Sequence, residues 1–130
     1  MRKVLELSNP VMIDGALTNH VEYDTDLITA LHFAQADAAK KQAAGLKNVA
    51  ITPAAEFDYG LHLYLGFAAI IAASGDKLTF QDCERIQGAD LIKVMNIGRN
   101  FIMPSAASTK DNSGDTSETT AEPSQPAQPN

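Results

Sequence analysis

The sequence predicts an α+β fold that is mainly helical, with an N-terminal β-hairpin packed on about four α-helices. The first 23 residues alternate apolar and polar side chains in two short runs, whereas residues 26–103 place apolar side chains at helical spacing. From residue 105 on, the chain contains no aromatic residue and no Val, Leu, Ile or Met. We therefore expect one compact domain over residues 1–104 and a disordered, acidic, Ser/Thr/Pro-rich tail over residues 105–130.

The hairpin is predicted from alternation at residues 4–7 and 17–23, with a short middle strand at residues 11–13 as an open alternative. Asp14 followed by Gly15 is a strong turn signal between these runs. A hairpin alone is marginally stable in water, so the helices that follow must cover its apolar face.

The first helix is expected over residues 26–44, because Asp24 and Thr25 can cap its start and Gly45 can end it. Its second half has high helix propensity and little to bury, so we expect that half to be exposed. The residues expected to share its apolar face are Leu27, Ile28, Leu31, Ala34 and Ala38.

The second helix is expected over residues 53–74, because Thr52 before Pro53 is a helix-start signal. It has no strongly polar face, which is typical of the central helix of a small domain. Its small residues Gly66, Ala69 and Ala73, beside His62, would let a neighbouring element approach closely.

Thr79 and Asp82 predict a capping box for a short third helix, and Gly88 separates that helix from a fourth over residues 89–103. The fourth helix is expected to stop before Pro104. Its apolar stripe consists of Leu91, Val94, Met95, Gly98, Phe101 and Ile102.

Composition and motifs argue against catalysis and nucleic-acid binding. The net charge of -6 is opposite to what a phosphate-binding surface needs. The chain lacks phosphate-loop, dinucleotide, nucleophile-elbow and calcium-loop patterns, and its three histidines are not spaced to share a metal ion. The acidic pairs at residues 24/26 and 82/84 are explained by helix dipoles. We expect no enzymatic activity, no cofactor and no metal.

The expected setting is the cytoplasm. The N-terminus does not run into a hydrophobic signal region, and the longest apolar run, residues 63–73, is shorter than the ~20 residues that span a bilayer. Cys83 is the only cysteine, so we expect a buried thiol in a reducing compartment. No membrane association is predicted.

The remaining candidate for function is a protein-binding surface. Not every face of two such apolar helices can be internal in a domain of this size, and an exposed remainder would mark a partner site. The residues predicted to contact a partner are Leu91, Met95, Phe101 and Ile102.

Several motifs together resemble a known family. They are LELSNPVMIDG at residues 5–15, LTFQD at residues 78–82, Asp90 followed by Leu91, and Phe101. Over about residues 4–102 the chain resembles the tail assembly chaperones of Mu-like and related contractile-tailed phages and prophages, often described as phage tail protein E. It departs from the family pattern in the acidic segment 21–26 and in a longer Ala-rich stretch at residues 35–49.

The resemblance implies a small non-enzymatic factor in the host bacterial cytoplasm that is not retained in the mature virion. It implies binding to the tape measure protein and help in recruiting tail tube subunits, and in many such systems a ribosomal frameshift yields a longer product. Two alternatives stay open: a small structural virion subunit, such as a tail completion or tube protein, and a helix-turn-helix DNA-binding regulator over residues 79–101. The sequence also leaves a homo-oligomer open.

Overall fold

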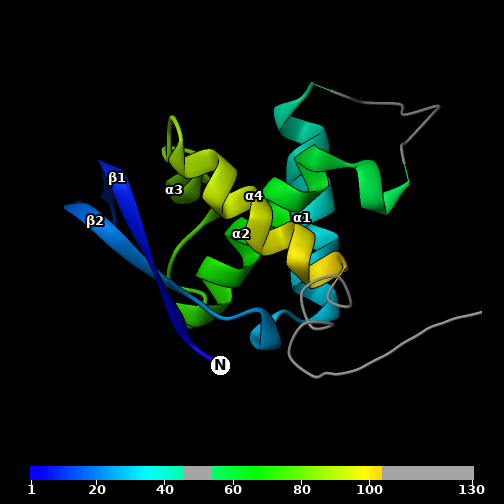
Figure 1. Ribbon diagram of the computed structural model, residues 1–130, viewed down its shortest axis with the longest axis horizontal. Helices are drawn as coiled ribbons and strands as arrows, with labels where there is room; N and C mark the ends of the chain where they lie inside the picture. The colour runs from blue at the N-terminus through cyan, green and yellow to red at the C-terminus, as the bar shows by residue number, and fades with distance from the viewer. Residues whose placement is uncertain (46–53, 104–130) are drawn as a thin grey trace, which may run out of the picture.

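The computed structural model describes residues 1–45 and 54–103, and in these ranges the chain has the predicted α+β fold. Helix α2 lies between the hairpin on the left and α1 on the right in Figure 1. The predicted disordered tail lies outside the described residues. In chain order, the elements are β1 (Lys3–Ile13), β2 (Ala16–Tyr23), η1 (Thr25–Leu27), α1 (Ala30–Ala43), η2 (Ala55–Phe57), α2 (Tyr59–Ala73), α3 (Phe80–Cys83) and α4 (Asp90–Ile102).

The hairpin forms as predicted around a two-residue turn, in which Asp14 and Gly15 have φ of 51° and 78°. The suggested middle strand is part of one long strand, β1. Its pairing with β2 is interrupted between Glu6 and Val11, where Pro10 offers no N–H for the ladder. On both sides of this interruption, alternate side chains of β1 still face inward. The buried apolar residues of this face are Leu5, Leu7, Val11 and Ile13 on β1 and Val21 on β2.

The interruption in β1 is fixed by a buried carboxylate on α4. Asp90 is 0 % exposed and accepts the backbone N–H groups of Ser8 and Asn9, each at 2.9 Å. These two hydrogen bonds lower the pKa of Asp90, although burial acts in the opposite direction. The carboxylate therefore connects the hairpin to the first turn of α4.

The predicted start of the first helix is wrong. Asp24 caps the short 3-10 helix η1, then Ile28 is extended, and α1 begins only after Thr29. Leu27 and Ile28 therefore lie outside α1, and the helix contains only three of the five residues of the predicted apolar face.

The predicted apolar face of the first helix is also wrong, since Leu31, Ala34 and Ala38 are exposed. Helix α1 docks on α2 through Ala36, which is fully buried, with Phe33 and Ala39 packed beside it. A small residue at the contact point lets two helices approach closely, and this selects the face. The second half of α1 is thus partly buried rather than exposed.

Helix α2 is the central helix, as predicted, and every residue from 61 to 73 except Leu63 is buried. Its start differs from the prediction: Thr52 and Pro53 lie outside the described residues, and α2 begins after Asp58, which accepts the Leu61 N–H at 3.0 Å. The backbone of Asp58, with ψ of 82°, separates α2 from η2, where Phe57 is 68 % exposed.

Helices α2 and α4 are in contact at their backbones, as the predicted small-residue face requires. A Cβ atom placed on Gly98 would lie 1.8 Å from the His62 carbonyl oxygen, and one on Gly66 would lie 2.2 Å from the Val94 carbonyl oxygen. Only glycine fits at such distances, and Gly66 lets the fully buried Val94 pack against α2.

The segment that leads from α2 to α4 begins with the capping box that the sequence predicts. Thr79 Oγ1 accepts the Asp82 N–H at 3.2 Å, and Asp82 accepts the Thr79 N–H at 3.0 Å, which completes the capping box. This box starts α3, which is a single turn. Gly88, with φ of 68°, then redirects the chain into α4.

Candidate protein-binding surface

The four residues predicted to contact a partner lie on α4 and are all half-buried. Leu91, Phe101 and Ile102 pack partly against the core, so each contributes both to packing and to the surface. The buried side of α4 is formed by other residues, including Ile97, which the predicted stripe omitted. The four predicted residues are therefore partly accessible, and we refer to their exposed parts as the α4 surface.

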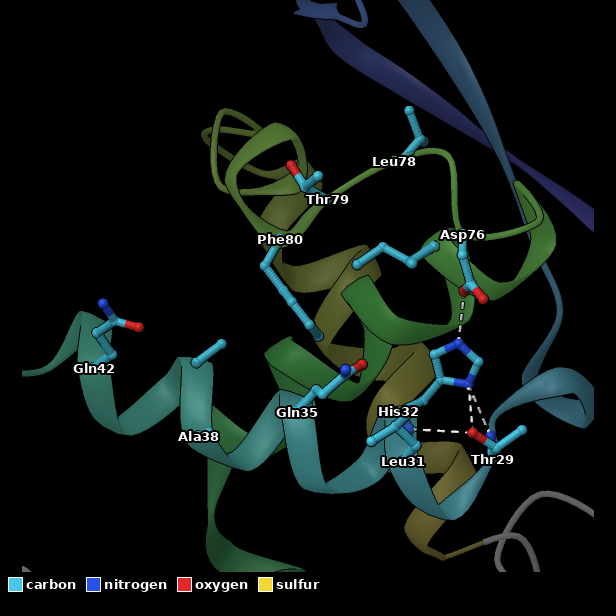
Figure 2. A pocket seen from close by; sticks show the side chains of 12 residues that line it. Thr29, Leu31, His32, Gln35, Ala38, Gln42, Asp76, Leu78, Thr79 and Phe80 are labelled. Atoms are coloured by element: carbon cyan, nitrogen blue, oxygen red, sulfur yellow. Dashed lines mark hydrogen bonds and ion pairs between the residues drawn. The ribbon is translucent and has the colours of Figure 1, made fainter.

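A second apolar surface lies elsewhere, in a groove of about 640 Å³ between α1 and the segment that leads from α2 into α3. In Figure 2, Leu31, Gln35 and Ala38 line one wall, and Phe80 points from the opposite wall toward α1. The apolar residues that line it are Leu31, Ala38, Ala39, Ile71, Leu78 and Phe80. We refer to this feature as the α1–α3 groove.

The apolar floor of the groove is continuous with the core. Ile71 is buried, whereas Leu78 and Phe80 are half-buried and pack against the core. Leu31, on the wall, is 65 % exposed. Exposed leucine next to half-buried aromatic and aliphatic side chains is the arrangement that protein-binding sites use.

One end of the groove is closed by a chain of hydrogen bonds, shown dashed in Figure 2. The Thr29 N–H donates to His32 Nδ1 at 3.0 Å, so Nδ1 carries no proton, and Nε2–H donates to Asp76 at 2.8 Å. This chain connects the start of α1 to the turn after α2.

When a carboxylate, an imidazole and a hydroxyl are joined by hydrogen bonds in that order, the hydroxyl can act as a nucleophile. Here the Thr29 hydroxyl lies 2.9 Å from His32 Nδ1, but its oxygen also accepts the His32 N–H at 3.2 Å as the cap of α1. The helix cap alone accounts for this geometry.

A second cavity of about 320 Å³ extends the groove along α1. The two cavities share Ala39, Gln42, Thr79 and Phe80 as lining residues, and the second ends beside Glu84. Among the described residues, the ionisable side chains that line either cavity are, apart from His32, the carboxylates of Asp76 and Glu84. The extended groove is thus apolar along its floor and acidic toward its two ends.

The carboxylate of Glu84 is hydrogen-bonded to Tyr64, a residue of the core. The Tyr64 hydroxyl donates to it at 2.7 Å, and burial together with this hydrogen bond raises the pKa of Tyr64. The carboxylate itself stays exposed at the surface.

The other candidates from the sequence are separate from this groove. His20 is exposed beside Asn19, and His62 is buried with Nε2 2.7 Å from the Ala55 carbonyl oxygen. Within residues 1–45 and 54–103, no cluster of three metal-ligating side chains occurs. Cys83 is fully buried, as predicted, and burial raises its pKa to about 12.

Sequence reasoning missed the groove because its walls come from segments some 40 residues apart. The signal that could have indicated it was Leu31, an apolar residue in a stretch otherwise rich in alanine and polar side chains.

No family model, curated protein or solved structure matches this chain. No helix in the described ranges is both long and apolar enough to cross a membrane. The function is therefore inferred from the residues and surfaces of the chain itself.

Proposed function

We propose that this protein is a tail assembly chaperone of the type found in Mu-like and related contractile-tailed phages. In this role it binds the tape measure protein and helps recruit tail tube subunits, acts in the host bacterial cytoplasm, and is not retained in the mature virion. The observation that carries the proposal is the α1–α3 groove, an apolar surface that no other described segment of the chain covers.

The physical requirements of a chaperone fit this surface. A holding factor needs apolar area that a client can cover, and enough charge to keep the complex in solution. The groove offers the first, and the net charge of -6 offers the second. The sequence motifs at residues 5–15 and 78–82 support the same assignment through the family resemblance.

The α4 surface is a second part of the proposed client site. Met95 and Leu91 are half-buried on α4, and Ile92 next to them is 55 % exposed. A long client could contact this surface and the groove together, since a chaperone of this size can cover only short segments of it.

The deciding experiment is co-expression of the full chain with the tape measure protein encoded nearby. We expect a stable complex and a larger soluble fraction of the tape measure protein. If neither is seen, the proposal is wrong. Mass spectrometry of purified phage particles is the companion measurement, because recovery of this chain in them would favour the alternative of a structural virion subunit.

A further inference from the structure

We infer that the α1–α3 groove binds an amphipathic helix of the client whose apolar face is flanked by lysine or arginine residues. This inference rests on the proposed function, because it takes the groove as the client site, and it adds the conformation and the charge of the bound segment. It follows from three features of the groove: its backbone hydrogen bonds, its length and its charge.

The first feature is that the N–H groups along the walls are already bonded and are not offered to an extended peptide. One wall is α1, whose peptide groups are bonded within the helix. On the other wall, the N–H groups of Lys77 and Leu78 both donate to Ser74 Oγ at 3.1 Å, and that of Thr79 donates to Asp82 at 3.0 Å. A bound strand would therefore leave its own carbonyl groups without N–H partners, whereas a helix satisfies them internally.

The second feature is length. The linked cavities follow α1 from Thr29 to Ala43, and 14 helical residues at about 1.5 Å each make a wall of roughly 21 Å. A helix of about four turns would match this wall. It would place three or four apolar side chains, at the i, i+3, i+4 and i+7 positions, over Leu31, Ile71 and Phe80.

The third feature is charge. Among the described residues, the carboxylate side chains that line the groove are Asp76 and Glu84, one near each end, and the side chain of Asp76 is 67 % exposed. The α1 wall between them carries the neutral amides of Gln35 and Gln42. Basic residues at both ends of the incoming helix would meet opposite charge, and acidic ones would be repelled.

The probe for this inference is an 18-residue amphipathic peptide with leucines at helical spacing and lysines at its flanks. Its matched control carries glutamate in place of each lysine. Binding to the full chain is measured by fluorescence anisotropy, peptide helicity by circular dichroism, and the site by amide shifts in ¹H–¹⁵N NMR spectra.

We expect the lysine peptide to become helical on binding and to shift amides of α1 and α3. Leu31→Gln should weaken binding by at least about tenfold, because one buried leucine contributes that order of affinity. Leu17→Gln is the matched control, since Leu17 is 71 % exposed but lies on β2, away from the groove, and it should leave binding unchanged. Both wild-type side chains are largely in solvent, so both variants should fold.

Three results would overturn the inference: no binding of the lysine peptide at about 1 mM, equal binding of the lysine and glutamate peptides, or equal binding by Leu31→Gln and wild type. A fourth result would also overturn it: dimerisation of the free chain that Leu31→Gln abolishes, because a second copy would then be the occupant.

Failure of the proposed function would give a different result from failure of this inference. In that case the lysine peptide binds, but the tape measure protein does not. If the tape measure protein binds wild type and Leu31→Gln equally, the function stands and the groove is not its site.

Discussion

Replacing Gly98 with alanine should separate the two central helices. The new Cβ atom would lie 1.8 Å from the His62 carbonyl oxygen and 3.0 Å from the Gly66 nitrogen, whereas carbon and oxygen atoms normally stay about 3.3 Å apart or more. The contacted atoms belong to the backbone of α2, so no side chain can rotate to make room. Helix α4 must therefore shift by more than an ångström from its packed position.

The expected cost follows from two opposing effects. Alanine favours the helical state over glycine by about 1 kcal/mol. Overpacking costs up to about 3 kcal/mol, and more where backbone rather than side chains must move. Because a displaced α4 also loosens the packing of Val94 and Ile97, we expect a net loss of about 3 kcal/mol. In a domain of this size the melting temperature should fall by more than about 10 °C.

The assay is thermal and urea unfolding followed by circular dichroism, with Gly60→Ala as the matched control. At Gly60 the added Cβ would lie 3.3 Å from Cδ of Lys40, part of a flexible side chain that can move. That variant should be within about 1 kcal/mol of wild type. If Gly98→Ala proves as stable as Gly60→Ala, the close α2–α4 contact is refuted.

Three further outcomes are expected. Because Asp90 has a lowered pKa in the fold, its contribution to stability is present above its usual pKa near 3.8 and is lost as the pH falls through the folded value. Asp90→Asn should therefore destabilise the domain at pH 7 and flatten its loss of urea stability below pH 4, and equal acid sensitivity of variant and wild type would contradict this. With its pKa raised to about 12, the buried Cys83 thiol should react with a thiol reagent at pH 8 only after unfolding in urea, and immediate labelling of the native chain would show that it is accessible. Met95→Asp should leave the circular dichroism spectrum and melting curve near those of wild type while weakening tape measure binding, whereas Ile97→Asp, at a site 8 % exposed, should unfold the domain. Unfolding by Met95→Asp would instead place Met95 in the core.

The elements that could be predicted from sequence are those set by local chemistry. The turn at Asp14 and Gly15, the capping box of Thr79 with Asp82, and the length of α4 each depend on residues a few positions apart. The uniformly apolar composition of α2 was enough to identify it as the central helix. In these cases local preference and global packing agree.

The features that could not be predicted depend on distant partners. The docking face of α1 is set by the fit of Ala36 on α2, and hydrophobic periodicity gives more weight to Leu31, which the fold leaves exposed. The role of Asp90 requires the amides of residues 8 and 9, more than 80 positions away. Nothing in the sequence near Asp90 distinguishes it from an ordinary first-turn acid of a helix.

Two further long-range contacts hold α1 in place and so affect how the groove would bind a helix. Helix α1, one of its walls, is attached to the α2 region near both ends: His32 meets Asp76 at 2.8 Å, and Lys40 meets Asp58 at 2.7 Å. The first pair is largely exposed at Asp76 and adds little stability, but the second involves side chains only 12 % and 9 % exposed and is screened far less. Two attachments separated by about two helical turns restrict both the tilt and the distance of α1 relative to α3. A groove of fixed width binds without an added cost of ordering its own wall, so more of the apolar contact energy is available for affinity. In the proposed role of holding a client and later releasing it, such a site would also allow release by competition for the client helix, with no change in the fold of this protein.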